Sequence, residues 1–160
     1  QAVPELPTQL QVLQMRIIAD ADAAYVCFTA GRPITMIGLD VTRKALCYPS
    51  IVDRMDKIGN KASKLFVDLM RHFCKSQKEV FGWEGGPLHD PITIAWLIDP
   101  SVVETKPMHA EIDIRSVQSY GRTNCDFFGY QKLEPNADVG IGIDADKFWD
   151  MVEEVLRMYD

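Results

Sequence analysis

The longest regular pattern in the sequence is helical. Between Asn60 and Phe81, apolar residues recur at steps of three and four positions, with charged residues between them. This spacing is typical of an amphipathic helix. We therefore predict a helix from Asn60 or Lys61 to Phe81 that packs one face on a core. That face is expected to contain Ala62, Leu65, Phe66, Leu69, Met70, Phe73, Cys74, Val80 and Phe81.

Capping signals and the same periodicity predict three further helices. Asp20 can cap a helix that ends before Gly31, and Pro49–Ile58 indicates a short helix closed by Gly59. Asp144 can cap the last helix of the chain. The buried face of that last helix is expected to consist of Phe148, Met151, Val152, Val155, Leu156 and Tyr159.

Strand-like segments lie between these helices. The apolar run Ile34–Leu39 is typical of a buried strand, and residues 108–115 alternate as a half-exposed strand does. Residues 120–128 and 139–143 favour two more strands, the first of them antiparallel. These are too few strand–helix units for a complete doubly wound sheet. We predict an α/β fold: part of an open, Rossmann-like sheet with helices packed on it, in a single domain that is incomplete.

Composition narrows the class of protein. A chain of 160 residues fits one domain, and a net charge of −6 argues against nucleic acid as a partner. No apolar run reaches membrane-spanning length, and the N-terminus lacks the order of a secretion signal. The four cysteines are widely spaced, so we expect reduced, mostly buried thiols in a cytoplasmic protein.

Candidate chemistry is concentrated in residues 83–98. Two glycines and a proline predict a flexible loop bearing Trp83, and the pair His89-Asp90 follows where a helix should start, with Pro91 at its first position. On the motif alone, Asp before Pro is more typical of an N-cap than of a ligand. Asp40, at the end of the predicted strand 34–39, is a second candidate to which we assign no role.

With these residues in view, the sequence resembles the inosine-uridine preferring nucleoside hydrolases, in the C-terminal half of that family. The resemblance rests on Ala19–Ala24, Pro33–Thr42 with its Gly-Leu-Asp-Val-Thr, Leu88-His89-Asp90-Pro91 and Asp146–Trp149, in the family's order. It covers about residues 17–160, whereas residues 1–16 form an irregular lead-in that does not match. A detached C-terminal portion of a nucleoside hydrolase is the hypothesis that follows.

The resemblance implies an enzyme that hydrolyses the N-glycosidic bond of purine or pyrimidine ribonucleosides, releasing ribose and the free base for salvage. It implies that Asp90 is one ligand of a calcium ion that binds the ribose diol, and that His89 helps to protonate the departing base. Trp83, beside the same loop, is a candidate for contact with the substrate. The family's N-terminal Asp-x-Asp-x-Gly-x-Asp-Asp segment, which supplies the other calcium carboxylates, has no counterpart in this sequence.

Three hypotheses stay open. The chain is part of a nucleoside hydrolase, or it is a non-catalytic remnant that serves as a binding or interaction module of the same fold, or it binds another small molecule near Asp40. A truncated sheet would leave strand edges and apolar faces exposed, so we also expect self-association, as a homo-oligomer or as aggregates. Base preference does not follow from these residues.

Overall fold

The structure is a computed structural model in which residues 17 and 19–159 are described. They belong to two compact units. The first contains the described residues up to Asp40 together with Thr105–Ile141, and the second contains Val41–Glu104 together with the described residues from Gly142. Helices and short strands alternate along the chain, so the predicted α/β class is confirmed.

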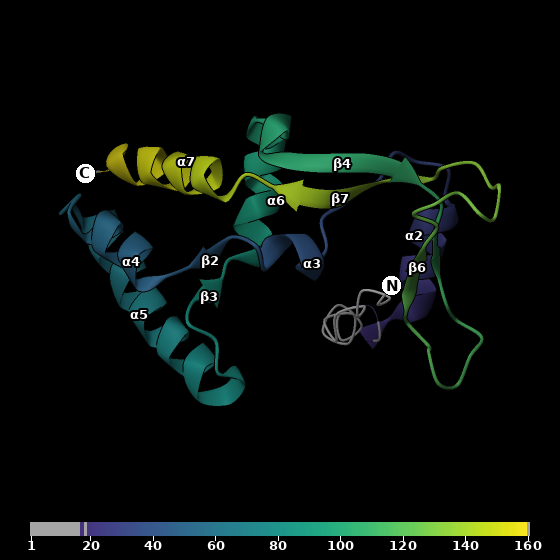
Figure 1. Cartoon of the computed structure of the whole chain (residues 1–160), viewed down its shortest axis with the longest axis horizontal. Helices are drawn as coiled ribbons and strands as arrows, with labels where there is room; N and C mark the ends of the chain where they lie inside the picture. Colours follow the sequence, from purple (N-terminus) through teal and green to yellow (C-terminus); the bar gives the residue numbers. More distant parts are fainter. Residues whose placement is uncertain (1–16, 18, 160) are drawn as a thin grey trace, which may run out of the picture. The chain divides into compact units, whose positions relative to one another are not determined.

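The first unit is built on strands. Its elements are α2 (Ala21–Thr29), β1 (Thr35–Met36), β5 (Ala110–Ile112) and β6 (Thr123–Cys125), with most of β4 (Val103–Met108) and β7 (Ala137–Ile143). The strands β1, β7 and β4 form a sheet in that order (Figure 1), with β1 parallel to β7. The strands β5 and β6 pair antiparallel, as predicted. The core of this unit consists of Met108, Ala110, Ala137 and Val139, against which Phe28, Ile34, Met36 and Ile141 pack.

The second unit is mainly helical. Its elements are β2 (Leu46–Cys47), α4 (Pro49–Asp56), α5 (Lys61–Phe81), β3 (Gly86–Pro87), α6 (His89–Ile98), the 3₁₀ turn η1 (Pro100–Val102) and α7 (Ala145–Arg157). A short helix, α3 (Leu39–Thr42), carries the chain into this unit. The helix α4 packs on α5, and both contact α7. Phe148 and Trp149 of α7 are buried, with their rings edge to face.

The predicted caps at Asp20 and Asp144 are confirmed, because their side chains accept hydrogen bonds from the backbone N–H groups of Ala23 and Lys147. Asn60, which was expected only as a possible first residue of its helix, caps α5 by accepting from the Ser63 N–H. The Asn60 amide also donates to the carbonyl oxygens of Leu156 and Tyr159, at 2.7 and 2.6 Å. One side chain thereby satisfies backbone groups at the start of α5 and at the end of α7.

One strand prediction was wrong in extent, and one strand was not predicted. The apolar run Ile34–Leu39 pairs only at Thr35 and Met36, and Leu39 already begins α3. Asp40 is therefore an exposed residue in the first turn of a helix, not the residue that ends a strand. The strand β4 was not predicted, because buried and exposed residues do not alternate along it and because it contains Pro107. Proline is tolerated there because β4 lies at an edge of the three-stranded sheet.

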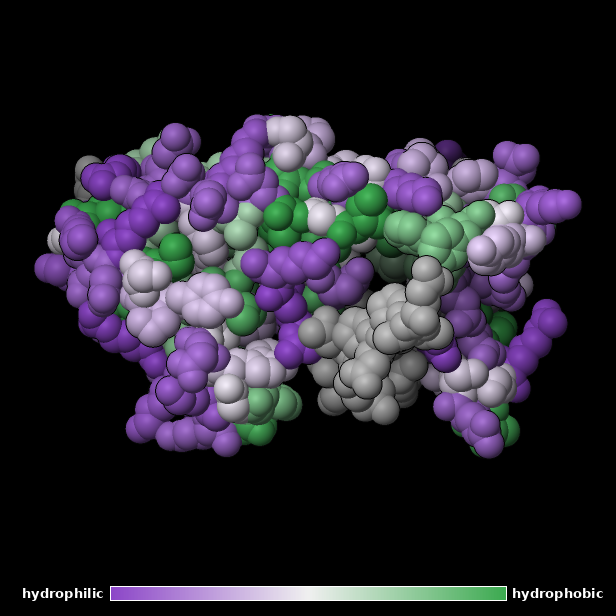
Figure 2. Space-filling model, viewed as in Figure 1, coloured by the Kyte–Doolittle hydropathy of each residue, from purple (hydrophilic) through white to green (hydrophobic). Residues whose placement is uncertain are grey.

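The predicted buried faces of the long helices are only partly correct. Ser63, Val67 and Met70 are the buried residues of α5, whereas Leu65 and Leu69 are 62% and 61% exposed. Figure 2 shows apolar residues, in green, on a surface that is otherwise largely hydrophilic. Exposed side chains that were predicted to be buried, or that lie in an apolar run, are Leu65, Leu69, Val80, Phe81, Ile94, Leu97, Ile98, Val155 and Tyr159.

The burial of the cysteines differs from the prediction. All four are free thiols. Cys47 is buried, Cys74 is half-buried, and Cys27 and Cys125 are exposed, so the expectation of mostly buried thiols was wrong. Burial, with a contribution from Cys74, raises the pKa of the Cys47 thiol to about 12. None of the described helices has both the length and the apolar character needed to cross a bilayer.

Candidate functional site

The segment before the His-Asp pair is held in place by close backbone contacts. Gly86 and Pro87 form β3, which pairs antiparallel with Cys47 and Leu46 of β2. Residues 85–87 are buried. A Cβ atom on Gly85 would lie 2.8 Å from the carbonyl oxygen of Cys47, and one on Gly86 would lie 2.8 Å from Cδ1 of Phe73. The expected flexible loop is thus a packed connection at residues 85–87, where glycine serves close approach rather than mobility.

The helix α6 begins two residues earlier than predicted. His89 and Asp90 are its first two residues, so Pro91 occupies the third position, where its missing N–H removes no intrahelical hydrogen bond. The N-cap is Leu88, which makes no side-chain cap. The interpretation of Asp90 as an N-cap was therefore wrong. Its exposed carboxylate lies in the first turn, where the helix dipole favours negative charge.

A hydrogen bond joins the His-Asp segment to a distant part of the sequence. Thr42 Oγ1 lies 2.7 Å from Nδ1 of the half-buried His89. Thr42 is 2% exposed and ends α3. Both residues belong to the second unit, and 47 positions separate them in sequence. Thr42 was not among the predicted site residues, although it ends the Gly-Leu-Asp-Val-Thr motif.

Trp83 is already engaged by its neighbours. Its ring stacks on Phe81 with a centroid separation of 4.9 Å, and the Arg43 guanidinium carbon lies 3.8 Å from its centroid. A nucleobase that stacked on Trp83 would compete with these two contacts.

The described residues do not by themselves fit a calcium ion. Calcium takes six to eight oxygen ligands. Across residues 17 and 19–159, no three His, Cys, Asp or Glu side chains come together in a way that could hold a metal. The carboxylate of Asp90 therefore needs ligands from elsewhere if it is to hold calcium.

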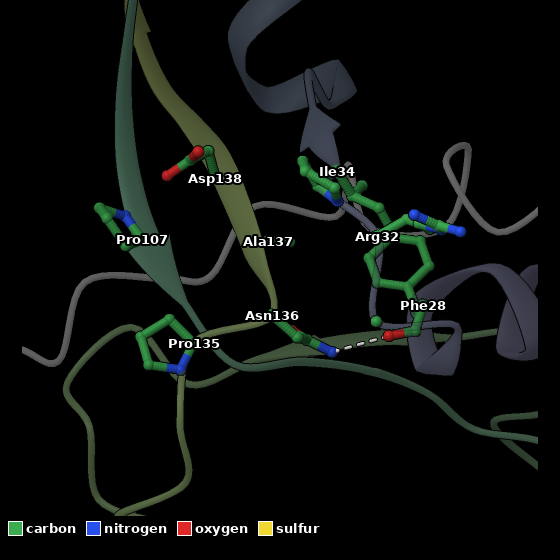
Figure 3. A pocket seen from close by; sticks show the side chains of 10 residues that line it. Phe28, Arg32, Ile34, Pro107, Pro135, Asn136, Ala137 and Asp138 are labelled. Carbon is green, nitrogen blue, oxygen red and sulfur yellow. Dashed lines mark hydrogen bonds between the residues drawn. The ribbon is translucent and has the colours of Figure 1, made fainter.

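A hollow in the first unit is not the predicted site. It measures about 430 Å³ and is lined by Phe28 of α2, residues 31–34 before β1, Pro107 of β4 and residues 135–138 at the start of β7 (Figure 3). Phe28 and three prolines supply apolar walls, and the Asn136 amide donates to the Phe28 carbonyl oxygen at 3.1 Å. Neither His89, Asp90 nor Trp83 lines it.

The sequence matches the inosine-uridine preferring nucleoside hydrolase family over residues 14–150, and the chain belongs to this family. The resemblance drawn from the motifs is thereby confirmed. The division at residue 17 stays a prediction, although the family match includes residues 14–16.

Relatives and solved structures agree with this assignment. A relative from Shigella flexneri, described as a pyrimidine-specific ribonucleoside hydrolase, RihB, is 44% identical over 146 residues, which are 91% of this chain and 47% of the relative. A purine-preferring ribonucleoside hydrolase from Gardnerella vaginalis superimposes with a TM-score of 0.76 at 29% identity, over 89% of this chain and 46% of that one. A plant nucleoside hydrolase, PpNRh1, shares the fold, with a TM-score of 0.75 at 20% identity over 88% of this chain and 46% of that one. The chain thus spans about half the length of the relatives it matches.

Proposed function

We propose that this chain contributes one wall of the active site of a ribonucleoside hydrolase, with His89 beside the departing base and Asp90 facing the ribose. The reaction cleaves the N-glycosidic bond with water and releases ribose and a free base. The name of the relative at 44% identity makes uridine and cytidine the first substrates to test, with inosine as the purine alternative.

One observation carries the proposal. The two segments on which the family resemblance mainly rests, Gly-Leu-Asp-Val-Thr and Leu-His-Asp-Pro, meet directly at the 2.7 Å hydrogen bond between Thr42 and His89. A histidine that merely begins a helix has no need of a buried hydroxyl 47 positions away. The bond holds the imidazole beside Asp90 at the start of α6.

The roles follow from the chemistry of glycosidic cleavage. The transition state resembles an oxocarbenium ion, and the base leaves with negative charge that a hydrogen-bond or proton donor must meet. His89 is the residue proposed to meet it. We propose Asp90 as one ligand of a calcium ion whose other oxygen ligands lie outside the described residues.

Activity can be tested in two forms of the protein. The chain itself is assayed for ribose release from uridine, cytidine and inosine, and a chimera is assayed in which the chain replaces the matching segment of Shigella flexneri RihB. We expect an active chimera that loses roughly 10²–10⁴-fold in kcat on His89→Ala, because general acid catalysis contributes about that much. The exposed His72 provides the control variant, His72→Ala. A folded but inactive chimera, or full activity of His89→Ala, contradicts the proposal.

Calcium can be tested separately from activity. We expect calcium to raise the Tm of the chimera, and the shift to disappear in Asp90→Asn but not in Asp68→Asn, which changes an exposed carboxylate of α5. An equal shift in both variants would remove Asp90 from the metal site.

The alternative is a non-catalytic interaction module. The absence of a three-residue metal cluster from residues 17 and 19–159 favours it for the chain alone. A chain that folds but releases no ribose, together with a folded chimera that also releases none and shows no calcium-dependent Tm shift, would support the interaction module instead.

A further inference from the structure

The hydroxyl group of Thr42 has few hydrogen-bond acceptors within reach. Thr42 is 2% exposed, so water does not solvate the group. Within the described part of the chain, His89 Nδ1 is the only hydrogen-bond partner of Thr42 Oγ1. The Ala45 N–H bonds to the backbone carbonyl of Thr42 and leaves the hydroxyl untouched.

Two arrangements are compatible with the 2.7 Å distance between Oγ1 and Nδ1. Either the hydroxyl donates to a bare Nδ1, or a protonated Nδ1 donates to the hydroxyl oxygen. In the second arrangement the hydroxyl hydrogen remains buried without an acceptor. Such an orphaned donor disfavours that arrangement by roughly tenfold or more.

We propose that Thr42 is a positioning residue that fixes the tautomer of His89, with Nδ1 as acceptor and the ring hydrogen on Nε2. The hydrogen bond also fixes the ring plane, since Nδ1 must point at Oγ1. Nε2–H is then the group that the imidazole presents as a donor, on the far side of the ring from Thr42.

The consequence for catalysis rests on the proposed function, whereas the tautomer does not. In a ribonucleoside hydrolase, a histidine held as the Nε2–H form carries its hydrogen on the nitrogen proposed to meet the departing base. Thr42 itself touches no substrate in this proposal and acts only through His89.

Nitrogen-15 NMR of the imidazole rings reads the tautomer directly, without nucleoside or metal. The chain has three histidines, so His72→Asn and His109→Asn variants identify the His89 signals by elimination. At about pH 8.5 an ordinary imidazole is neutral. We expect wild-type His89 to show one pyrrole-like nitrogen at Nε2 and one pyridine-like nitrogen at Nδ1.

Two substitutions separate the hydroxyl from the shape of the side chain. Thr42→Ser keeps the hydroxyl and should leave the nitrogen shifts of His89 as in wild type. Thr42→Val keeps the shape, removes the hydroxyl, and should move both shifts toward those of mixed tautomers. A pyrrole-like Nδ1 in the wild-type protein overturns the proposal even if Thr42→Val does not fold, and so do unchanged shifts in a folded Thr42→Val.

Kinetics of the chimera provides the second readout. We expect Thr42→Val to lower kcat by about tenfold or more with little change in KM, and Thr42→Ser to restore kcat. A higher KM with unchanged kcat would assign Thr42 to substrate binding and overturn the positioning role. An Nε2–H tautomer in a chimera without any activity would instead contradict the proposed function and leave the tautomer standing.

Discussion

The two adjacent glycines before His89 provide the sharpest test of how the site is supported. In Gly85→Ala, the new Cβ would lie 2.8 Å from the carbonyl oxygen and 3.1 Å from the carbonyl carbon of Cys47. In Gly86→Ala, it would meet Cδ1 of Phe73 at 2.8 Å and the Cys74 sulfur at 3.1 Å. An alanine at position 85 therefore collides with backbone atoms, whereas an alanine at position 86 collides with side chains that can move.

The magnitude follows from two opposing effects. Overpacking of this kind costs about 1–3 kcal/mol. Neither glycine has a positive φ, so alanine is allowed by the backbone and gains about 0.4–1 kcal/mol by restricting the unfolded chain. We expect Gly85→Ala to lower the free energy of unfolding by about 1–2 kcal/mol, and Gly86→Ala to lower it by less.

Urea unfolding of the single and double variants measures these differences. Phe73→Leu removes the ring that Gly86→Ala meets, so the two substitutions should couple favourably by about 0.5 kcal/mol or more. The matched pair Gly85→Ala with Phe73→Leu should be additive, because the Cys47 carbonyl cannot be trimmed. A Gly85→Ala variant as stable as the wild type would refute the close contact between residues 85 and 47.

Three further predictions concern a helix cap, an ion pair and two of the cysteines. Asn60→Ala should lower the free energy of unfolding in urea by about 2–3 kcal/mol, because it removes one helix cap and two hydrogen bonds to the end of α7. Asn60→Asp keeps the cap, so its free energy of unfolding should lie between those of Asn60→Ala and wild type. The hydrogen bond from Lys147 is the main cause that lowers the pKa of Asp99 to about 2. The ionised Asp99 therefore stabilises the fold fully above its ordinary pKa of 3.8, and this stabilisation is lost as pH falls toward 2. The difference in Tm between wild type and Asp99→Asn, measured at several pH values, should vanish across that interval. At about pH 8, mass spectrometry should find the exposed Cys27 alkylated by iodoacetamide much faster than Cys47, since burial keeps Cys47 protonated; equal rates would contradict that burial.

The features that sequence reasoning predicted are local ones. The caps at Asp20 and Asp144 were predictable because the side chain, the backbone N–H it accepts from and the helix pattern lie within a few residues. The family motifs around His89 and Asp90 were readable for the same reason.

The features it missed depend on contacts between distant segments. Periodicity shows that Leu65 and Leu69 share a face of α5 but not which neighbour, if any, covers that face. The glycines at 85 and 86 suggested mobility until β2 was seen against them. The bond between Thr42 and His89 joins two segments that no local pattern connects.

Apolar side chains left in water on α5 and α6 have a practical consequence for anyone who handles this protein. Leu65, Leu69, Ile94, Leu97 and Ile98 are each more than half exposed, and full burial of such a side chain is worth about 1.5–3 kcal/mol. Solubility is then set by whatever is available to cover these two helices. Sulfate and phosphate buffers strengthen burial and so promote clustering, whereas dilute, low-salt solutions keep the molecules apart.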